Sequence, residues 1–125
     1  MENVIGEIAG KVWRHLNESG EQPPSVVAKA LNIKVSDLDR ALGWLAREDK
    51  LSFSADNVVR AMGENAGLLW RLLKERGAST PATVAKLLGL KNSELDQAIG
   101  WLAREGKLSF GLEGNGSQKL SIKEE

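Results

Sequence analysis

The stretch GWLAREDKLSF at residues 43–53 returns as GWLAREGKLSF at residues 100–110, with a single letter changed. Its first part places apolar residues at helical spacing, and its last part alternates apolar and polar residues as a half-buried strand does. Each stretch therefore predicts a helix that is followed by a short strand. A glycine and a tryptophan stand side by side in the helical part, although glycine inside a helix costs about 1 kcal/mol relative to alanine.

The same shift of 57 positions aligns most of the chain with itself. IGEIAGKVWRHLNESG falls on MGENAGLLWRLLKERG, and PSVVAKALNIKVSDLDRALGWLARE falls on PATVAKLLGLKNSELDQAIGWLARE, without a gap. A tandem duplication explains this self-similarity. The 125 residues therefore predict two small domains, which we name copy one (residues 1–60) and copy two (residues 61–125).

Apolar periodicity predicts three helices in each copy. The first helix stops at Gly20 in copy one and at Gly77 in copy two, because glycine readily adopts the left-handed conformation that ends a helix. The second helix begins at Pro24 or Pro81, since proline is favoured at the first helical position, and Thr80 is a suitable N-cap. The predicted core face of the first helix in copy one comprises Ile5, Ala9, Val12 and Leu16.

The third helix of each copy is predicted to open at a serine N-cap, Ser36 or Ser93. An aspartate three residues further on, Asp39 or Asp96, completes a weaker form of the capping box. The predicted core face comprises Leu38, Ala41, Leu42 and Leu45 in copy one, and Leu95, Ala98, Ile99 and Leu102 in copy two.

After the third helix the apolar period changes from helical to alternating. In copy two, KLSFG and KLSI flank a loop with Asn115-Gly116, which is a strong hairpin signal. In copy one we favour a tighter hairpin, in which Asp56-Asn57 turns the chain and VVRAM returns as a strand. The alternative is that Asn57 caps one long helix from Val58 to Arg76.

This order of helices and hairpin resembles the winged helix-turn-helix. The residues that carry the resemblance are VVAKALNIKVSDLDRALGWLAREDKLSF and its repeat. The motifs GE-x-AG-x-x-W and GWLARE-x-K further resemble a small bacterial winged-helix family of uncharacterised function. The resemblance implies a mainly α fold with small β-hairpins (α+β), arranged as two tandem winged helix-turn-helix domains. It leaves the function open, because many winged helices bind DNA and some bind only proteins.

Composition excludes several function classes. The chain has no cysteine and one histidine, so it offers no disulfide, no thiolate nucleophile and no usual zinc site. His15 is predicted to lie on the surface, and no catalytic set or phosphate-binding loop stands out. We therefore expect a non-enzymatic protein with no catalytic residues, metal, cofactor or small-molecule ligand. No signal peptide or membrane span is evident, which predicts a cytoplasmic protein.

The third helix of a DNA-binding winged helix enters the major groove. The predicted DNA-facing residues, as in a transcription regulator, are Arg40, Arg47, Gln97 and Arg104, with Lys34 and Lys91 near the phosphates. Arginine and glutamine can read base edges through paired hydrogen bonds. However, the formal net charge is zero and both third helices are net acidic, whereas duplex affinity depends on excess basic charge. We favour a regulatory protein that binds DNA, weakly or as part of a larger assembly. The alternative is a protein-protein adaptor that binds no nucleic acid.

The glycine-tryptophan pairs predict close helix packing. One interpretation is internal to each copy: Trp44 or Trp101 lies over bare glycines of the first helix, four residues apart. The other is an interface, in which Gly43 and Gly100 let a helix of the other copy or of another chain approach closely, with tryptophan as the anchor.

Differences between the copies suggest a second contact surface. Copy two has Leu68 and Leu72 where copy one has Lys11 and His15. These leucines widen the apolar arc of the first helix beyond its predicted core face, and such an arc is usually covered on more than one side. We expect the other copy or a homodimer partner to cover them. No flexible linker separates the copies, which predicts a fixed relation between them.

Overall fold

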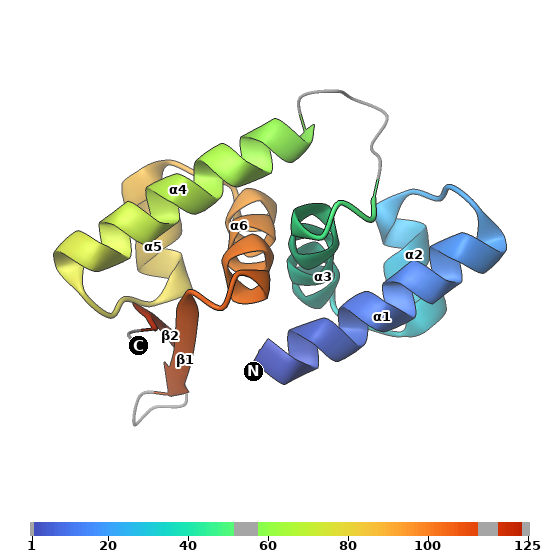
Figure 1. Cartoon of the computed structure of the whole chain (residues 1–125), viewed down its shortest axis with the longest axis horizontal. Helices are drawn as coiled ribbons and strands as arrows, with labels where there is room; N and C mark the ends of the chain where they lie inside the picture. Colours follow the sequence, from blue (N-terminus) through green and yellow to red (C-terminus); the bar gives the residue numbers. More distant parts are fainter. Residues whose placement is uncertain (1, 52–57, 113–117, 124–125) are drawn as a thin grey trace.

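The computed structural model of the chain describes residues 2–51, 58–112 and 118–123. The elements, in chain order, are α1 (Glu2–Ser19), α2 (Pro24–Leu31), α3 (Val35–Arg47), α4 (Val58–Arg76), α5 (Pro81–Leu88), α6 (Asn92–Arg104), β1 (Leu108–Leu112) and β2 (Gln118–Ile122). Three helices form each copy, and α3 and α6 lie side by side at the centre of the molecule (Figure 1). The predicted fold class, a mainly α protein of two tandem winged-helix copies, is confirmed.

In each copy the first helix ends, and the second helix begins, at the predicted residues. Gly20 and Gly77 follow α1 and α4 with φ angles of 81° and 86°, a conformation that side chains with a Cβ rarely adopt. α2 and α5 begin at the predicted prolines. The main-chain N–H of Thr83 donates a hydrogen bond to the hydroxyl of Thr80 at 3.4 Å, so Thr80 is the N-cap of α5.

The predicted serine caps of the third helices are wrong. α3 and α6 begin one residue before the serines, and their N-caps are Lys34 and Lys91, both in an extended conformation. In α6 the side chain of Glu94 accepts a hydrogen bond of 2.9 Å from the main-chain N–H of Lys91. The acidic residue of the first turn thus caps the helix, and Ser36 and Ser93 lie inside that turn.

Copy two carries the predicted wing. β1 and β2 pair antiparallel, with Phe110 opposite Leu120. Leu108 and Leu120 are fully buried while their neighbours are more exposed, as expected for a strand with one face on the core. The predicted turn at Asn115-Gly116 lies outside the described residues.

The hairpin favoured for copy one is wrong, because the segment VVRAM, which was expected to return as a strand, forms the first residues of α4. The alternative, one helix over Val58–Arg76, is correct; Asp56 and Asn57 lie outside the described residues. The helix is more favourable than a strand here, because it places four apolar side chains on one face, at the spacing of 3.6 residues per turn. These buried residues are Met62, Ala66, Leu69 and Leu73. A domain boundary after residue 60 would therefore fall inside the first turn of α4.

Each copy has its own hydrophobic core. In copy one the cluster comprises Ala9, Val12, Val27, Ala28, Leu38, Ala41, Leu42 and Leu45. In copy two it comprises Ala66, Leu69, Leu73, Val84, Ala85, Leu95, Ala98, Ile99, Leu102, Leu108 and Leu120. The predicted core faces of the third helices are confirmed. Within the described residues, no helix combines the length and the apolar character needed to cross a bilayer.

Candidate functional site

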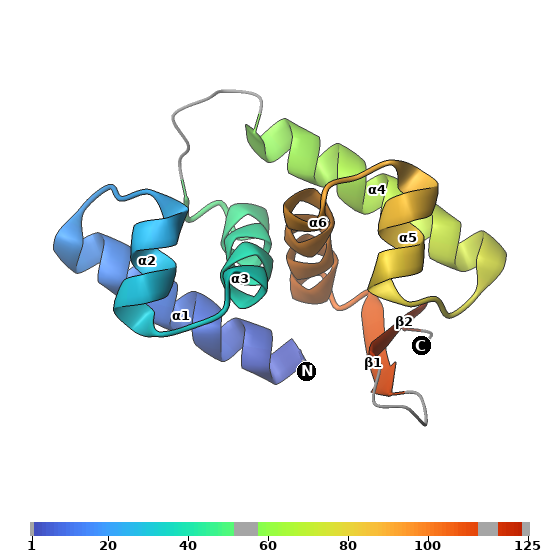
Figure 2. The same ribbon diagram turned by 180° about the vertical axis from the view of Figure 1, so that it is seen from behind.

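The joint between the two copies is formed by α3 and α6, which lie against each other in both views of the molecule (Figures 1 and 2). The helices run parallel, because Arg40 pairs with Asp96 near their starts and Arg47 pairs with Glu105 near their ends. Each contact has a counterpart 57 residues away. The joint is therefore an internal pseudo-dimer interface, in which equivalent patches meet as in a two-fold symmetric dimer.

Gly43 and Gly100 form the centre of the joint, where the two helix backbones touch. A Cβ added to Gly43 would lie 2.7 Å from the carbonyl carbon of Gln97 and would overlap its oxygen. A Cβ added to Gly100 would meet the carbonyl group of Arg40 in the same way. Only glycine fits at these two positions, and this close approach explains a residue type that otherwise weakens a helix.

Two polar pairs cross the joint near the N-terminal ends of the helices. Nε of Arg40 donates a hydrogen bond of 2.9 Å to the carboxylate of Asp96, and each side chain is only 12% exposed. At the equivalent position, the amide nitrogen of Gln97 donates to the carboxylate of Asp39 at 3.2 Å. The pseudo-symmetry is thus chemical as well as geometric, although one pair is ionic and the other is not.

Two further ion pairs close the joint near the C-terminal ends. Arg47 donates to Glu105 at 3.0 Å, and Arg104 donates to Glu48 at 2.8 Å. Both arginines are about half-exposed, with 46% of their side-chain surface accessible, so solvent weakens these pairs relative to the inner ones.

The two tryptophans contact both copies at once. The ring of Trp44 lies 3.0 Å from where a Cβ on Gly6 would be, and Trp101 lies 3.2 Å from the same point on Gly63. The guanidinium group of an arginine from the other copy also lies over each ring; that of Arg104 is 5.8 Å from the centroid of Trp44. The internal packing and the interface considered from the sequence therefore occur together. The first helix of each copy has a second glycine four residues further on, Gly10 or Gly67. A Cβ added to either of these glycines would have no neighbouring atom within 4 Å.

Burial raises the pKa of the two aspartates of the joint above the ordinary value of 3.8. For Asp39, the loss of solvation is the largest cause; the hydrogen bond from Gln97 lowers the pKa, and the charge of Asp96 raises it. For Asp96, the loss of solvation again dominates, and the hydrogen bond and charge of Arg40 oppose it. Ionised carboxylates in this joint are therefore less well accommodated than in water.

Because burying the ionised carboxylate of Asp39 is unfavourable, the variant Asp39→Asn should be more stable than the parent protein at a pH where Asp39 is ionised. A raised folded-state pKa means that the folded protein holds a proton more tightly than the unfolded chain, so Asp39 favours folding most at acidic pH. That contribution is lost as the pH rises from below 3.8 through the folded pKa. Asparagine does not titrate and can still accept the hydrogen bond from Gln97.

Urea unfolding of both proteins between about pH 3 and about pH 7 measures this effect. We expect the free energy of unfolding of Asp39→Asn, relative to the parent protein, to increase with pH over this range. A difference that stays constant or decreases would contradict a raised pKa at Asp39.

The remaining predicted residues lie apart from the joint. Lys34 and Lys91 are exposed at the N-terminal ends of α3 and α6. Leu68 is 39% exposed, so neither copy covers it. Leu72 is partly buried and packs against the core of copy two, so its own copy covers part of its side chain. Nε2 of His15 donates a hydrogen bond of 2.7 Å to the side-chain oxygen of Gln22.

The acidic partners of the joint were not recognised from the sequence as contact residues. From the sequence, Asp39 and Asp96 were assigned to capping boxes, and Glu48 and Glu105 contributed only to the net acidic charge of the third helices. The signal was present, because each acid stands next to the basic or amide residue of its own helix. When two such helices lie parallel with equivalent faces together, each carboxylate lies next to an arginine or glutamine of the other copy. No group of acidic or histidine residues suited to a metal occurs in the described part of the chain.

Fold and joint together define a class of protein, a tandem winged-helix protein whose two third helices pack on each other. The comparison with known families agrees: the chain matches the family described as "Winged helix-turn-helix domain (DUF2582)" twice, over residues 1–61 and 58–123. The protein therefore belongs to this winged helix-turn-helix family, as the sequence motifs predicted.

One relative shows how a single copy compares with the tandem chain. An uncharacterized protein of Methanocaldococcus jannaschii is 43% identical over 56 residues, which are 42% of this chain and 79% of that protein. The aligned length is close to the 57-residue shift between the copies. No solved structure matches the chain.

Proposed function

We propose that this protein is a non-enzymatic protein-interaction module, built as an internal pseudo-dimer of winged helices. The observation that carries the proposal is that the four side chains suited to reading bases are already engaged within the protein. Arg40, Gln97, Arg47 and Arg104 are each paired with a carboxylate of the other copy. A side chain held in such a pair has to leave its partner before it can contact a base.

The arrangement of α3 and α6 supports the same proposal. Dimeric helix-turn-helix proteins place their recognition helices in successive major grooves, about 34 Å apart along the duplex. Here the two helices touch at the backbones of Gly43 and Gly100. They share one joint, so each blocks the face that the other would present to DNA. Separating them would expose four carboxylates to the phosphates.

A DNA-binding regulatory protein is the second candidate function. It is supported by the family's winged helix-turn-helix fold and by the exposed Lys34 and Lys91, which lie at the same end of the parallel helix pair. In this case the phosphates would contact the helix ends and the wing, and the paired faces of α3 and α6 would take no part.

Titration of a labelled mixed-sequence duplex at about 50 mM and about 200 mM salt distinguishes the two functions. A protein-interaction module should show no saturable binding at either concentration. Saturable binding with a steep loss between the two salt concentrations would overturn the proposal. In that event the double variant Lys34→Glu, Lys91→Glu tests the helix ends, and Arg40→Ala, Arg47→Ala tests the paired face.

A further inference from the structure

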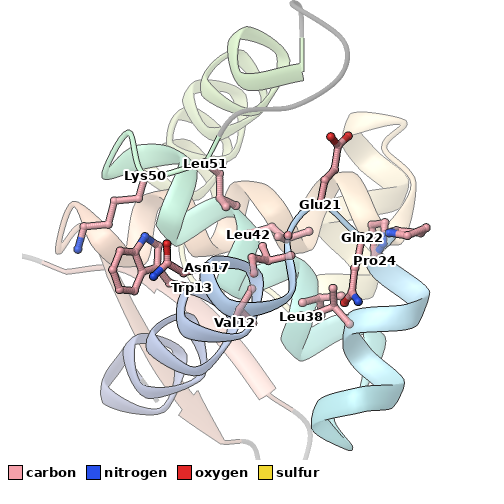
Figure 3. Close-up of a pocket in the computed structure, with 14 residues that line it drawn as sticks. Val12, Trp13, Asn17, Glu21, Gln22, Pro24, Leu38, Leu42, Lys50 and Leu51 are labelled. Carbon is pink, nitrogen blue, oxygen red and sulfur yellow. The ribbon is translucent and has the colours of Figure 1, made fainter.

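Copy one contains an open groove on one face of its core. Its volume is about 840 Å³, and it lies between α1, the segment 20–24 and Leu51. Figure 3 shows Trp13 and Lys50 on one side of the groove and Gln22 on the other, with Val12 between them. The floor is apolar, because it is formed by core side chains of copy one.

The repeat identifies what fills the equivalent space in copy two. Shifted by 57 positions, the groove residues Val12, Leu16, Val27 and Leu51 become Leu69, Leu73, Val84 and Leu108. Those four residues belong to one core cluster with Leu120, the fully buried centre of β2. In copy two, a strand with a central leucine therefore occupies the position of the groove.

The sequence of copy one cannot form this strand from the corresponding residues. The residues aligned with β2 are 61–65, and they are part of α4, which belongs to the core of copy two. Side-chain burial reflects the difference. Leu73 and Leu108 are 2% and 0% exposed, whereas their counterparts Leu16 and Leu51 are only half-buried.

The groove also has a main-chain edge ready for a strand. In copy two, Ser79 and Leu120 exchange two main-chain hydrogen bonds, of 2.9 Å and 2.8 Å. The counterpart of Ser79 is Gln22, whose main-chain groups bond to none of the other described residues. The next residue has the same extended conformation in both copies, with φ/ψ of −63°/149° at Pro23 and −77°/152° at Thr80.

We propose that this groove binds an extended peptide segment of a partner protein, which adds as a strand beside Gln22. An apolar side chain of the peptide, leucine in the case of β2, fills the space above Val12 and Leu51. Such strand addition draws affinity from main-chain hydrogen bonds and specificity from the pocket for one side chain. The inference rests on the proposed protein-interaction function and gives it a site and a partner class.

A synthetic peptide with the sequence of residues 117–123, SQKLSIK, which contains the sequence of β2, is the probe. It is titrated at up to millimolar concentration into the isotope-labelled full chain, and amide chemical shifts are recorded. We expect saturable shifts in α1 and residues 20–24 of copy one, and none at the equivalent positions of copy two, where β2 already lies. A peptide with aspartate in place of the leucine should bind at least about tenfold more weakly, because a carboxylate would be buried without a partner.

Two protein variants test the main-chain edge. Gln22→Pro removes the N–H group and should weaken binding by about threefold to tenfold, the value of one hydrogen bond. Gln22→Ala is the matched control, since it loses the side-chain bond to His15 but keeps the main-chain groups, and it should bind as the parent protein does.

Four outcomes would overturn the inference. The first is that the peptide causes no saturable shifts, and the second is that the shifts do not depend on the peptide's leucine. The third is that the same shifts appear when the chain is concentrated without peptide. The fourth is that the peptide binds only after residues 52–57 are replaced by glycine and serine. The third would indicate a second copy as the occupant, and the fourth the chain's own segment. A negative peptide titration without duplex binding rejects this site alone, whereas duplex binding rejects the proposed function.

Discussion

Gly43→Ala will lower the free energy of unfolding by about 3 kcal/mol or more, the upper part of the range for overpacked positions. The added methyl group overlaps the carbonyl oxygen of Gln97, which belongs to a helix backbone and cannot turn aside as a side chain can. The helices α3 and α6 must therefore move apart, and the polar pairs across the joint lengthen with them. Gly100→Ala should act in the same way through the carbonyl group of Arg40.

Urea unfolding, followed by circular dichroism, measures this effect. The matched control is Gly10→Ala, because a Cβ at Gly10 meets nothing within 4 Å. At that position alanine should stabilise the helix, by up to about 1 kcal/mol. If Gly43→Ala and Gly10→Ala changed stability alike, the backbone contact at the centre of the joint would not exist in solution.

Asp96→Ala will lower the free energy of unfolding by about 3 kcal/mol, the cost of leaving a buried charge without its partner. The guanidinium group of Arg40 would stay within the joint, where only 12% of its side chain is accessible to solvent. The double variant Arg40→Ala, Asp96→Ala should recover part of this loss, because it removes the unpaired charge as well.

Glu105→Ala is the control for the exposed end of the joint. Its partner Arg47 is 46% exposed and can be solvated once the pair is broken, so we expect a loss of at most about 1 kcal/mol. A double-mutant cycle for each pair separates the interaction energy from other effects of the substitutions. Equal losses for Asp96→Ala and Glu105→Ala would show that burial does not set the strength of these pairs.

The limits of prediction from the sequence are clearest at the third helices. Spacing alone placed Leu38, Leu45 and their counterparts in the two cores, because one face of an amphipathic helix has to leave water. Spacing could not reveal that the opposite face is also covered. That face carries arginine, glutamine, glycine and tryptophan, a set that suits DNA, a protein partner or a second copy of itself.

The segment VVRAM shows the same limit for secondary structure. Its apolar β-branched residues favour a strand locally, and a strand at this position would complete the first wing. The structure has a helix there, because Met62 begins the buried face of α4 and Gly63 lies under the ring of Trp101. A long-range contact thus overrides a local preference, and it leaves copy one with an open groove where copy two has β2.

The periodicity and the repeat were sufficient to establish two winged-helix copies, most of the extent of their helices and their separate cores, since these follow from local patterns of polarity. The pairing of α3 with α6 depends instead on groups more than 50 residues apart, such as Arg40 and Asp96. Shape and charge complementarity arise only when both surfaces are formed and brought together. For that reason the role of each glycine, aspartate and arginine in the joint became clear only from the folded chain.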